Sequence, residues 1–248
     1  LRCTVKIRCM TLFYDANIQA KTQEFVFSRE ESKHLAKVLR KTPGELITVT
    51  NGKGLEWNGK LLLVTPSKTS AKLEDATQHN ASKNQIHLAI APTKNNNRME
   101  WMLEKLTELG IASITPIKCH HSERKLVKTE RFEKIIIAGL KQSHQFFLPQ
   151  INELVPFSEF INRIKFDQTF IAHCEDLPKE KLLNLPLYGT ESCLMIGPEG
   201  DFSSTEIASA LQKNIIPVSL GQQRYRTETA GLLGCHTLFI KQQQYTNA

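Results

Sequence analysis

Residues 193–206 read CLMIGPEGDFSSTE, which places an apolar run, a glycine turn and a helix start in immediate succession. The run 193–196 has the length and composition of a buried strand. Gly197-Pro198-Glu199-Gly200 breaks it. Ser203-Ser204-Thr205-Glu206 then has the pattern of a capping box, in which serine and glutamate bond each other's backbone amides at the start of a helix. This order predicts one β-to-α unit of an α/β fold.

Outward from this unit, strands and helices alternate through the second half of the chain. The alternation predicts a mostly parallel sheet, whose ligands bind at the loops that follow the carboxyl ends of the strands. The expected strands are 86–91, 111–117, 169–173, 193–196 and 215–220. The expected helices are 99–109, 130–143, 205–212 and 228–243.

The first part of the chain has a different pattern, in which short apolar runs are separated by turns such as Asn51-Gly52-Lys53-Gly54. This pattern predicts a small β-rich domain over residues 10–75. Residues 76–85 lack periodicity and bulky apolar side chains, so we expect a linker there. The α/β domain then occupies residues 86–248.

One helix is expected inside the β-rich domain, from a capping box at Ser28 to the stop at Pro43-Gly44. Its apolar positions Leu35, Val38 and Leu39 share one face at helical spacing. Four cations fall at i, i+4, i+7 and i+8 on another face, which is either solvated or in contact with phosphate groups. These cations are Lys33, Lys37, Arg40 and Lys41.

The composition is that of a folded protein, with 40% hydrophobic and 23% charged residues among 248. The longest uncharged apolar stretch, 229–240, has 12 residues, and a membrane helix requires about 18, so we expect no membrane span. Residues 1–9 are basic but lack an apolar core with a cleavage site. We therefore expect no secretory signal, a start at Met10 and a cytoplasmic protein. The net charge of +7 favours a polyanionic partner.

Six cysteines are scattered without a Cys-x-x-Cys pair, which favours reduced structural thiols. The tight His/Cys groups are His120-His121 beside Cys119, and His173-Cys174. Neither group repeats at the spacing of a tetrahedral zinc site, so we expect no metal.

Two loops after late strands stand out, residues 196–200 and residues 220–230. Each is also consistent with a plain connection: a tight β-to-α turn in the first case, and a solvated charged loop capped by Thr227 in the second. Neither contains Gly-x-Gly-x-x-Gly or Gly-x4-Gly-Lys-Ser/Thr, so nothing predicts a cradle for a pyrophosphate or triphosphate. A ligand with an adenosine moiety but no phosphate, such as S-adenosylmethionine (SAM), fits better.

Together these segments closely resemble the signature of the RsmE family, the uracil-N3 methyltransferases of small-subunit (16S) ribosomal RNA in the SPOUT superfamily. Weaker family-like elements, among them His34 and Lys105, extend the match over residues 10 to about 240. One departure is Asp201, which stands where the family commonly has a second glycine. The resemblance rests on Met195-Ile196-Gly197-Pro198-Glu199-Gly200, Phe202-Ser203, Glu206, Leu220-Gly221 and Arg226-Thr227-Glu228-Thr229-Ala230.

The resemblance implies a PUA-like β-barrel at the N-terminus and a SPOUT domain whose C-terminal segment threads into a trefoil knot. It also implies SAM held in the knot loops, and a homodimer with active sites near its interface. The implied partner is ribosomal RNA within the small ribosomal subunit.

The expected site residues follow from the two loops and the resemblance. Arg226 is the candidate that stabilises the charge spreading to O2 and O4 of uracil as N3 loses its proton, because a guanidinium donates two parallel hydrogen bonds. Glu228 accepts the proton, fixes the arginine, or stabilises the helix start. Expected cofactor contacts are Met195, Ile196, Gly197, Gly200, Leu220, Gly221, Tyr225 and Thr227. Expected RNA contacts are Lys33, Lys37, Arg40, Lys41 and Arg124.

Two other functions stay open. One is ribose 2′-O methylation or transfer RNA modification, since the knot loops recur across SPOUT enzymes. The other is a non-catalytic RNA-binding factor of ribosome assembly that uses the basic helix alone. The intact glycines of both loops argue against the second.

Overall fold

The computed structural model describes residues 11–246 of the chain. They form two compact units. The first comprises the residues up to 81 together with residues 140–147, and the second comprises residues 82–139 and those from 148 onwards. The expectation about residues 1–9 lies outside the described residues.

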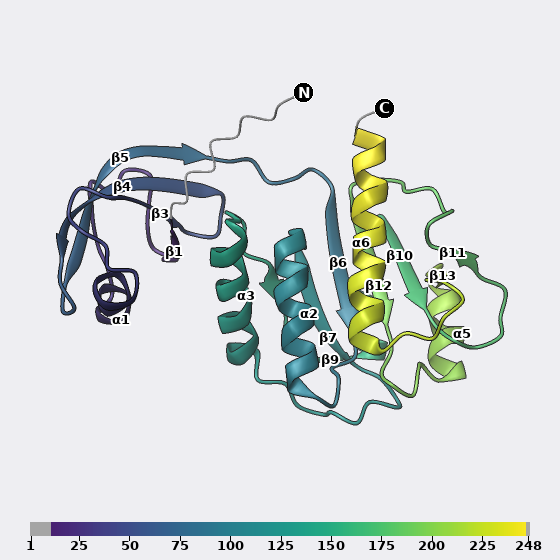
Figure 1. Ribbon diagram of the computed structural model, residues 1–248. Coiled ribbons are helices and arrows are strands. Elements are labelled where there is room, and N and C mark those ends of the chain that lie inside the picture. Colours follow the sequence, from purple (N-terminus) through teal and green to yellow (C-terminus); the bar gives the residue numbers. More distant parts are fainter. Residues whose placement is uncertain (1–10, 247–248) are drawn as a thin grey trace. The chain divides into compact units, whose positions relative to one another are not determined.

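The first unit is built on a five-stranded sheet of order β1-β3-β4-β5-β2 (Figure 1). Its neighbouring strands are antiparallel, except that β1 and β3 are parallel. The core lies around the buried ring of Trp57, whose Nε1 donates to the backbone oxygen of Thr22 at 2.9 Å. The strands are β1 (Leu12–Tyr14), β2 (Glu24–Val26), β3 (Leu46–Thr50), β4 (Leu55–Val64) and β5 (Thr69–Gln78).

The expected linker 76–85 is shorter in the structure, because β5 continues to Gln78. Ala76 lies opposite Trp57, and Gln78 lies opposite Leu55. The side-chain amide of Gln78 also donates, through Nε2, to the backbone oxygen of Lys53 at 2.8 Å. Pairing with β4 stabilises a segment whose own residues have little strand preference, so periodicity alone could not reveal it.

The basic helix begins as expected but does not continue as a regular α-helix. The Ser28 hydroxyl accepts a backbone amide of the first turn at 3.2 Å. The α-helix α1 (Arg29–Lys33) then gives way to one π-helical turn, η1 (His34–Val38). In this turn the amide of Leu39 donates to the oxygen of His34, five residues earlier, at 3.0 Å.

This wider turn changes which residues share a face. Leu35 is buried, whereas Val38 is 68% exposed, so the expected common apolar face is wrong at Val38. Arg40 lies beyond the helix with a positive φ of 51°. The expected four-cation stripe is therefore wrong after Lys37, because the spacing of an α-helix no longer applies.

The second unit is built on an eight-stranded sheet whose main path is β11-β13-β10-β12-β6-β7-β8, with β9 also paired to β7. Every pairing in it is parallel. The expected α/β class is therefore confirmed. The strands are β6 (Gln85–Ile90), β7 (Ser113–Lys118), β8 (Gln150–Ile151), β9 (Val155–Pro156), β10 (Gln168–Ala172), β11 (Glu180–Lys181), β12 (Glu191–Ile196) and β13 (Ile216–Ser219).

Helices cover both faces of this sheet. Successive side chains of a strand point to opposite faces, so Leu88 and Leu194 pack with α2, α3 and α6, while Ala89 and Met195 pack with α4 and α5. Helices α2 and α6 lie side by side on the first face (Figure 1). The helices are α2 (Asn96–Leu109), α3 (Thr129–Ser143), α4 (Phe157–Arg163), α5 (Ser204–Gln212) and α6 (Thr227–Thr246).

Within residues 11–246, no helix combines the length and the apolarity that crossing a bilayer requires.

Candidate functional site

The carboxyl ends of three neighbouring parallel strands, β10, β12 and β13, enclose a cavity of about 640 Å³. This volume is in the range of small-molecule sites. The cavity lies at the edge where the strand-end rule for parallel sheets predicts a ligand. Residues at the ends of all three strands and in the loops after them line it, including Ala172, Ile196, Gly197, Val218, Leu220 and Gly221.

The loop after β12 forms one wall, and Gly197 lets its backbone fold closely against Phe202. A Cβ at Gly197 would lie 3.0 Å from the amide nitrogen of Phe202, tighter than ordinary contacts allow. Asp201 has a positive φ of 65°. Its carboxylate accepts from its neighbour Phe202 at 2.8 Å and from the amide of Cys174 at 2.6 Å. These bonds stabilise a backbone conformation that favours glycine, at the position where the resemblance leads us to expect one.

The helix after this loop starts at the predicted capping box. The Ser203 hydroxyl accepts from the amide of Glu206 at 3.3 Å, and the Glu206 carboxylate accepts from the amide of Ser203 at 2.9 Å. The other Glu206 oxygen accepts from the amide of His120 at 2.8 Å, which joins the loop after β7 to α5. One glutamate thus fixes two loops at the same edge.

The loop after β13 forms the opposite wall and leads into α6. Gly221, Tyr225, Arg226 and Thr227 all line the cavity. A Cβ at Gly221 would lie 3.2 Å from the hydroxyl oxygen of Tyr225, so a larger side chain there displaces the tyrosine. Arg226 is exposed and Thr227 is buried, which places a cation at the rim and the first residue of α6 beneath it.

The loop after β10 supplies a third group, His173, which the sequence analysis considered only as a metal ligand. His173 lines the cavity and is 6% exposed. Burial lowers the pKa of its imidazole, and the nearby charge of Lys179 lowers it further. Lysine can only donate, and Nζ of Lys179 lies 3.5 Å from Nδ1, so the neutral ring carries its proton on Nε2. The strand-end rule applied to residues 169–173 is the signal that could have found it.

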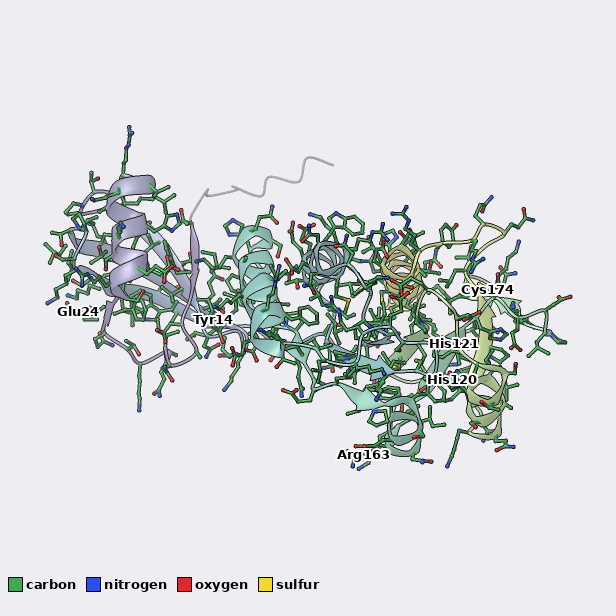
Figure 2. The ribbon with its side chains drawn as sticks, turned by 90° about the horizontal axis from the view of Figure 1, so that it is seen from below. Tyr14, Glu24, His120, His121, Arg163 and Cys174 are labelled. Carbon is green, nitrogen blue, oxygen red and sulfur yellow. The ribbon has the colours of Figure 1, made fainter. Side chains whose placement is uncertain are left out.

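Cys174 and His121 lie at the same edge (Figure 2). Both contact Asp201, the cysteine through its amide and His121 through a ring nitrogen 3.1 Å from the aspartate's backbone oxygen. Among the described cysteines, Cys119, Cys193 and Cys235 are free and buried, whereas Cys174 is free and exposed. Burial raises the pKa of Cys119, Cys193 and Cys235, which keeps these three protonated.

Two family models match the chain. A model described as an RNA methyltransferase domain matches residues 80–238, and one described as an RNA methyltransferase PUA domain matches residues 27–74. The chain belongs to this RNA methyltransferase family. The match at residues 27–74 shows that the first unit contains a PUA domain.

Curated relatives with the name ribosomal RNA small subunit methyltransferase E match most of the chain. The Bacillus subtilis relative is 26% identical over 84% of this chain and 86% of its own length. The relative from Buchnera aphidicola subsp. Acyrthosiphon pisum is 27% identical over 87% of each chain. These matches confirm the resemblance to the RsmE family.

Two solved structures are similar over nearly the whole chain. One is described as a probable rRNA-methyltransferase from Porphyromonas gingivalis, with a TM-score of 0.87, 33% identity and coverage of 95% of this chain and 100% of that one. The other is a Legionella pneumophila protein described as a methyltransferase in complex with bound SAM. It has a TM-score of 0.82, 28% identity and coverage of 92% of this chain and 96% of that one.

The structure brings most of the expected cofactor residues to the cavity but leaves two outside its lining. The side chain of Met195 is buried in the core between the sheet and α4 and α5, because it points to the face opposite Leu194. Gly200 faces His121, since a Cβ there would lie 3.1 Å from that residue's Cβ. The expected cofactor residues that do line the cavity are Ile196, Gly197, Leu220, Gly221, Tyr225 and Thr227.

The two expected catalytic residues lie on different sides of the α6 start. Arg226 lines the cavity. Glu228 is 6% exposed, and its Oε1 lies 3.8 Å from Nε of Arg98 on α2. The sequence analysis did not single out Arg98, which lies at the start of α2 and is brought to Glu228 only by the packing of α2 against α6.

The expected RNA residues also divide. Lys33 and Lys37 line a second cavity of about 660 Å³ within the first unit, together with Arg29, Glu30, Pro66 and Ser67. Lys41 is instead bound to Glu45, with 2.7 Å between Nζ and Oε2.

In the second unit, Arg124 uses its guanidinium within the protein. It donates to the backbone oxygen of Lys94 at 2.9 Å and to the side-chain oxygen of Asn96. These bonds hold the loop between β6 and α2.

Proposed function

We propose that the protein transfers a methyl group from SAM to N3 of a uridine in small-subunit ribosomal RNA. The carrying observation is the cavity at the carboxyl ends of β10, β12 and β13, with glycine backbone in two of its walls. The family match and the names of the curated relatives support the reaction class and the RNA substrate.

The cavity fits SAM by size and chemistry. About 640 Å³ accommodates a nucleoside with an amino-acid tail. Apolar residues form part of its wall, among them Ile196, Val218 and Leu220. Glu199 and Asp201 also line it and add negative charge suited to a sulfonium cation. The buried Nε2 of His173 has no hydrogen-bond partner within the described part of the chain, as expected of a group beside a polar ligand. SAM supplies an activated methyl group when bound.

The chain's own contribution to catalysis is orientation and charge. Uracil N3 lies on the Watson–Crick edge, so the base must be unpaired or flipped to reach the cavity. As its proton leaves, negative charge spreads to O2 and O4. Arg226 at the cavity rim donates hydrogen bonds to that charge. Glu228 is the second catalytic candidate, either as proton acceptor or as the group that holds an arginine.

RNA recognition is assigned to the PUA domain in the first unit. Arg29, Lys33 and Lys37 surround one cavity there, and cations in that arrangement contact backbone phosphates rather than bases. Arg40 and Lys41 contribute less in this proposal, because Arg40 lies beyond the helix and Lys41 is neutralised by Glu45.

We further propose that the C-terminal segment forms the trefoil knot of the superfamily. The connection between β10 and β12 carries β11 to the outer edge of β13. Helix α6 then returns to pack on β6 and β12, and Nζ of Lys241 donates to the backbone oxygen of Leu183 in that connection at 2.6 Å. Both observations are satisfied if the segment after β13 passes through the connection between β10 and β12 before it forms α6.

A homodimer is also part of the proposal. Trp101 on α2 is 45% exposed, and Leu233 and Ile240 on α6 are each 39% exposed. Leu233 and Ile240 are two turns apart and therefore lie on one side of α6. A second copy of the chain would cover these apolar side chains.

The test uses small ribosomal subunits from a strain that lacks this enzyme, with naked ribosomal RNA as a parallel substrate. The reaction contains isotopically labelled SAM, and mass spectrometry of the nucleosides identifies the product. The proposal expects labelled 3-methyluridine at one position. Labelled 2′-O-methylnucleosides or a transfer RNA substrate would support another SPOUT reaction, and absence of SAM binding by calorimetry would support a non-catalytic factor. Since ribosomes are the substrate source, the expected location is the cytoplasm.

A further inference from the structure

Glu228 is a buried carboxylate next to the cavity. The residue follows Thr227 in the first turn of α6 and is 6% exposed. A buried ionised carboxylate requires a compensating charge nearby. Arg98 provides it, with 3.8 Å between its Nε and Oε1 of Glu228. The carboxylate is thus engaged with an arginine of α2.

Arg98 reaches this pair from the first turn of α2, and its side chain remains 41% exposed. Helix α2 follows β6, which is parallel to β12, so Arg98 lies at the same sheet edge as the cavity. The atom of the guanidinium that pairs with Glu228 is Nε, and the group has two further nitrogens that can donate hydrogen bonds. Such a planar pair of donors matches two oxygens of a phosphate group.

The loop that leads into α2, and so to Arg98, is fixed to the cavity wall. The amide of Lys94 donates to Oε1 of Glu199 at 3.1 Å, and Glu199 lines the cavity. Arg124 donates to two groups of the same loop, at Lys94 and Asn96. Arg98 is therefore held through its backbone by this loop and through its side chain by Glu228.

We propose that Arg98 binds a phosphodiester group beside the target uridine, and that Glu228 is the positioning residue that orients it. The inference rests on the proposed RNA methyltransferase function and adds a substrate contact to it. A phosphate held at this point fixes the flipped nucleotide relative to Arg226 and the methyl donor. Arg98 acts in substrate binding, whereas Arg226 acts in the chemical step.

The chain offers a matched control pair on the same helix. Glu100 on α2 lies 2.5 Å from Nε of Arg131 on α3, and this arginine is 53% exposed. The pair has the same chemistry as Glu228 and Arg98. It joins α2 to α3, whereas the proposed pair joins α2 to the start of α6.

The experiment measures KM and kcat for small ribosomal subunits, and the salt dependence of RNA binding, for the wild type and six variants. Arg98→Ala should raise KM about tenfold, as expected for a lost charge-assisted bond, while kcat stays within about threefold. The slope of log affinity against log salt should fall by about 0.7, the value for one phosphate of a single strand. Arg98→Lys should keep that slope but recover only part of the affinity.

The positioning role of Glu228 is tested with a double-mutant cycle that combines changes at Glu228 and Arg98. Glu228→Ala should raise KM like Arg98→Ala, and the double variant should be no worse than Arg98→Ala alone, because both changes remove one interaction. Glu228→Gln, which keeps a side-chain oxygen near Nε of Arg98 but loses the charge, should recover part of the affinity. Arg131→Ala should leave KM, kcat and the salt slope at wild-type values. Thermal melting verifies that each variant is folded.

An Arg98→Ala variant with wild-type KM and salt slope would overturn the phosphate contact. A fall in kcat alone would also overturn it, by placing Arg98 in the chemical step. Additive effects of the Arg98 and Glu228 variants would overturn the positioning role. Failure of the proposed function is distinguishable, because the wild-type protein would then transfer no methyl group to the subunits.

Discussion

Strands β4 and β6 show how differently the two units use a sheet. Along β4, buried and more exposed side chains alternate, so one face carries the core of the PUA domain. Along β6, every residue after Gln85 is buried, because helices cover both faces. When helices cover both faces of a sheet, the ends of its strands remain open for ligands. In the first unit, the exposed face of the sheet and its turns remain open instead. The cofactor is therefore assigned to the second unit and, apart from the one phosphodiester group at Arg98, the RNA phosphates are assigned to the first unit. Each assignment can be broken independently.

The largest effect should come from the glycine after β13. Gly221→Val should abolish measurable SAM binding by calorimetry, because the side chain displaces Tyr225 into the cavity. RNA binding by the first unit should remain. A folded Gly221→Val protein with wild-type SAM affinity would show that the cofactor site has been misplaced.

A smaller effect is expected at the cavity rim. Arg226→Ala should lower kcat by raising the activation free energy of the chemical step by about 2–4 kcal/mol, as for other donors that meet charge only in the transition state. Binding of SAM and RNA should change little. Arg163→Ala is the control, since that exposed arginine of α4 pairs with Glu159 at 2.8 Å (Figure 2). Equal single-turnover rates for the two variants would remove Arg226 from the chemical step.

The first unit is tested by reversing charges. Lys33→Glu/Lys37→Glu should weaken RNA binding and flatten its salt dependence, and SAM affinity should stay unchanged. The control is Lys60→Glu/Lys72→Glu, an equal charge change at exposed cross-strand partners in the sheet. If both double variants bind RNA equally well, the cavity beside α1 is not the phosphate site.

The smallest effect concerns acid stability. Burial lowers the pKa of His87 and His173 below the ordinary value of 6.5, and both belong to the second unit. Below pH 6.5 the unfolded chain therefore binds more protons than the folded one. The contribution of the buried neutral histidines to the free energy of unfolding is present above pH 6.5, and it is lost as the pH falls through their lowered pKa values in the folded protein. Denaturant titrations should show the free energy of unfolding falling between pH 7.5 and pH 5. His87→Gln should make this dependence on pH less steep. An unchanged slope would contradict burial of a neutral His87.

The sequence predicted the cavity better than the basic surface, and the reason is physical. Ile196, Gly197, Leu220 and Gly221 were found because an apolar run followed by glycine marks a strand end in any parallel sheet. The faces of the basic helix depended on an α-helical period that the π-helical turn at residues 34–38 breaks. Nothing in that stretch signals such a turn.

Other features depend on contacts between distant residues. The pair Arg98 and Glu228 forms only because α2 packs against α6. The strands β8, β9 and β11 have two residues each and were not predicted, because so short a segment has no readable period. Met195 belongs to the same apolar run as Ile196 but points to the opposite face, and the run alone does not say which face meets the cavity.

Hydrogen exchange with and without SAM tests the central claim most directly, because it reads the backbone amides of both loops in the intact chain. SAM should slow exchange at residues 197–202 and 220–226, and residues 29–41 of the first unit should exchange as before. Protection confined to the first unit, or absent from both loops at saturating SAM, would contradict a cofactor site at the carboxyl ends of β10, β12 and β13.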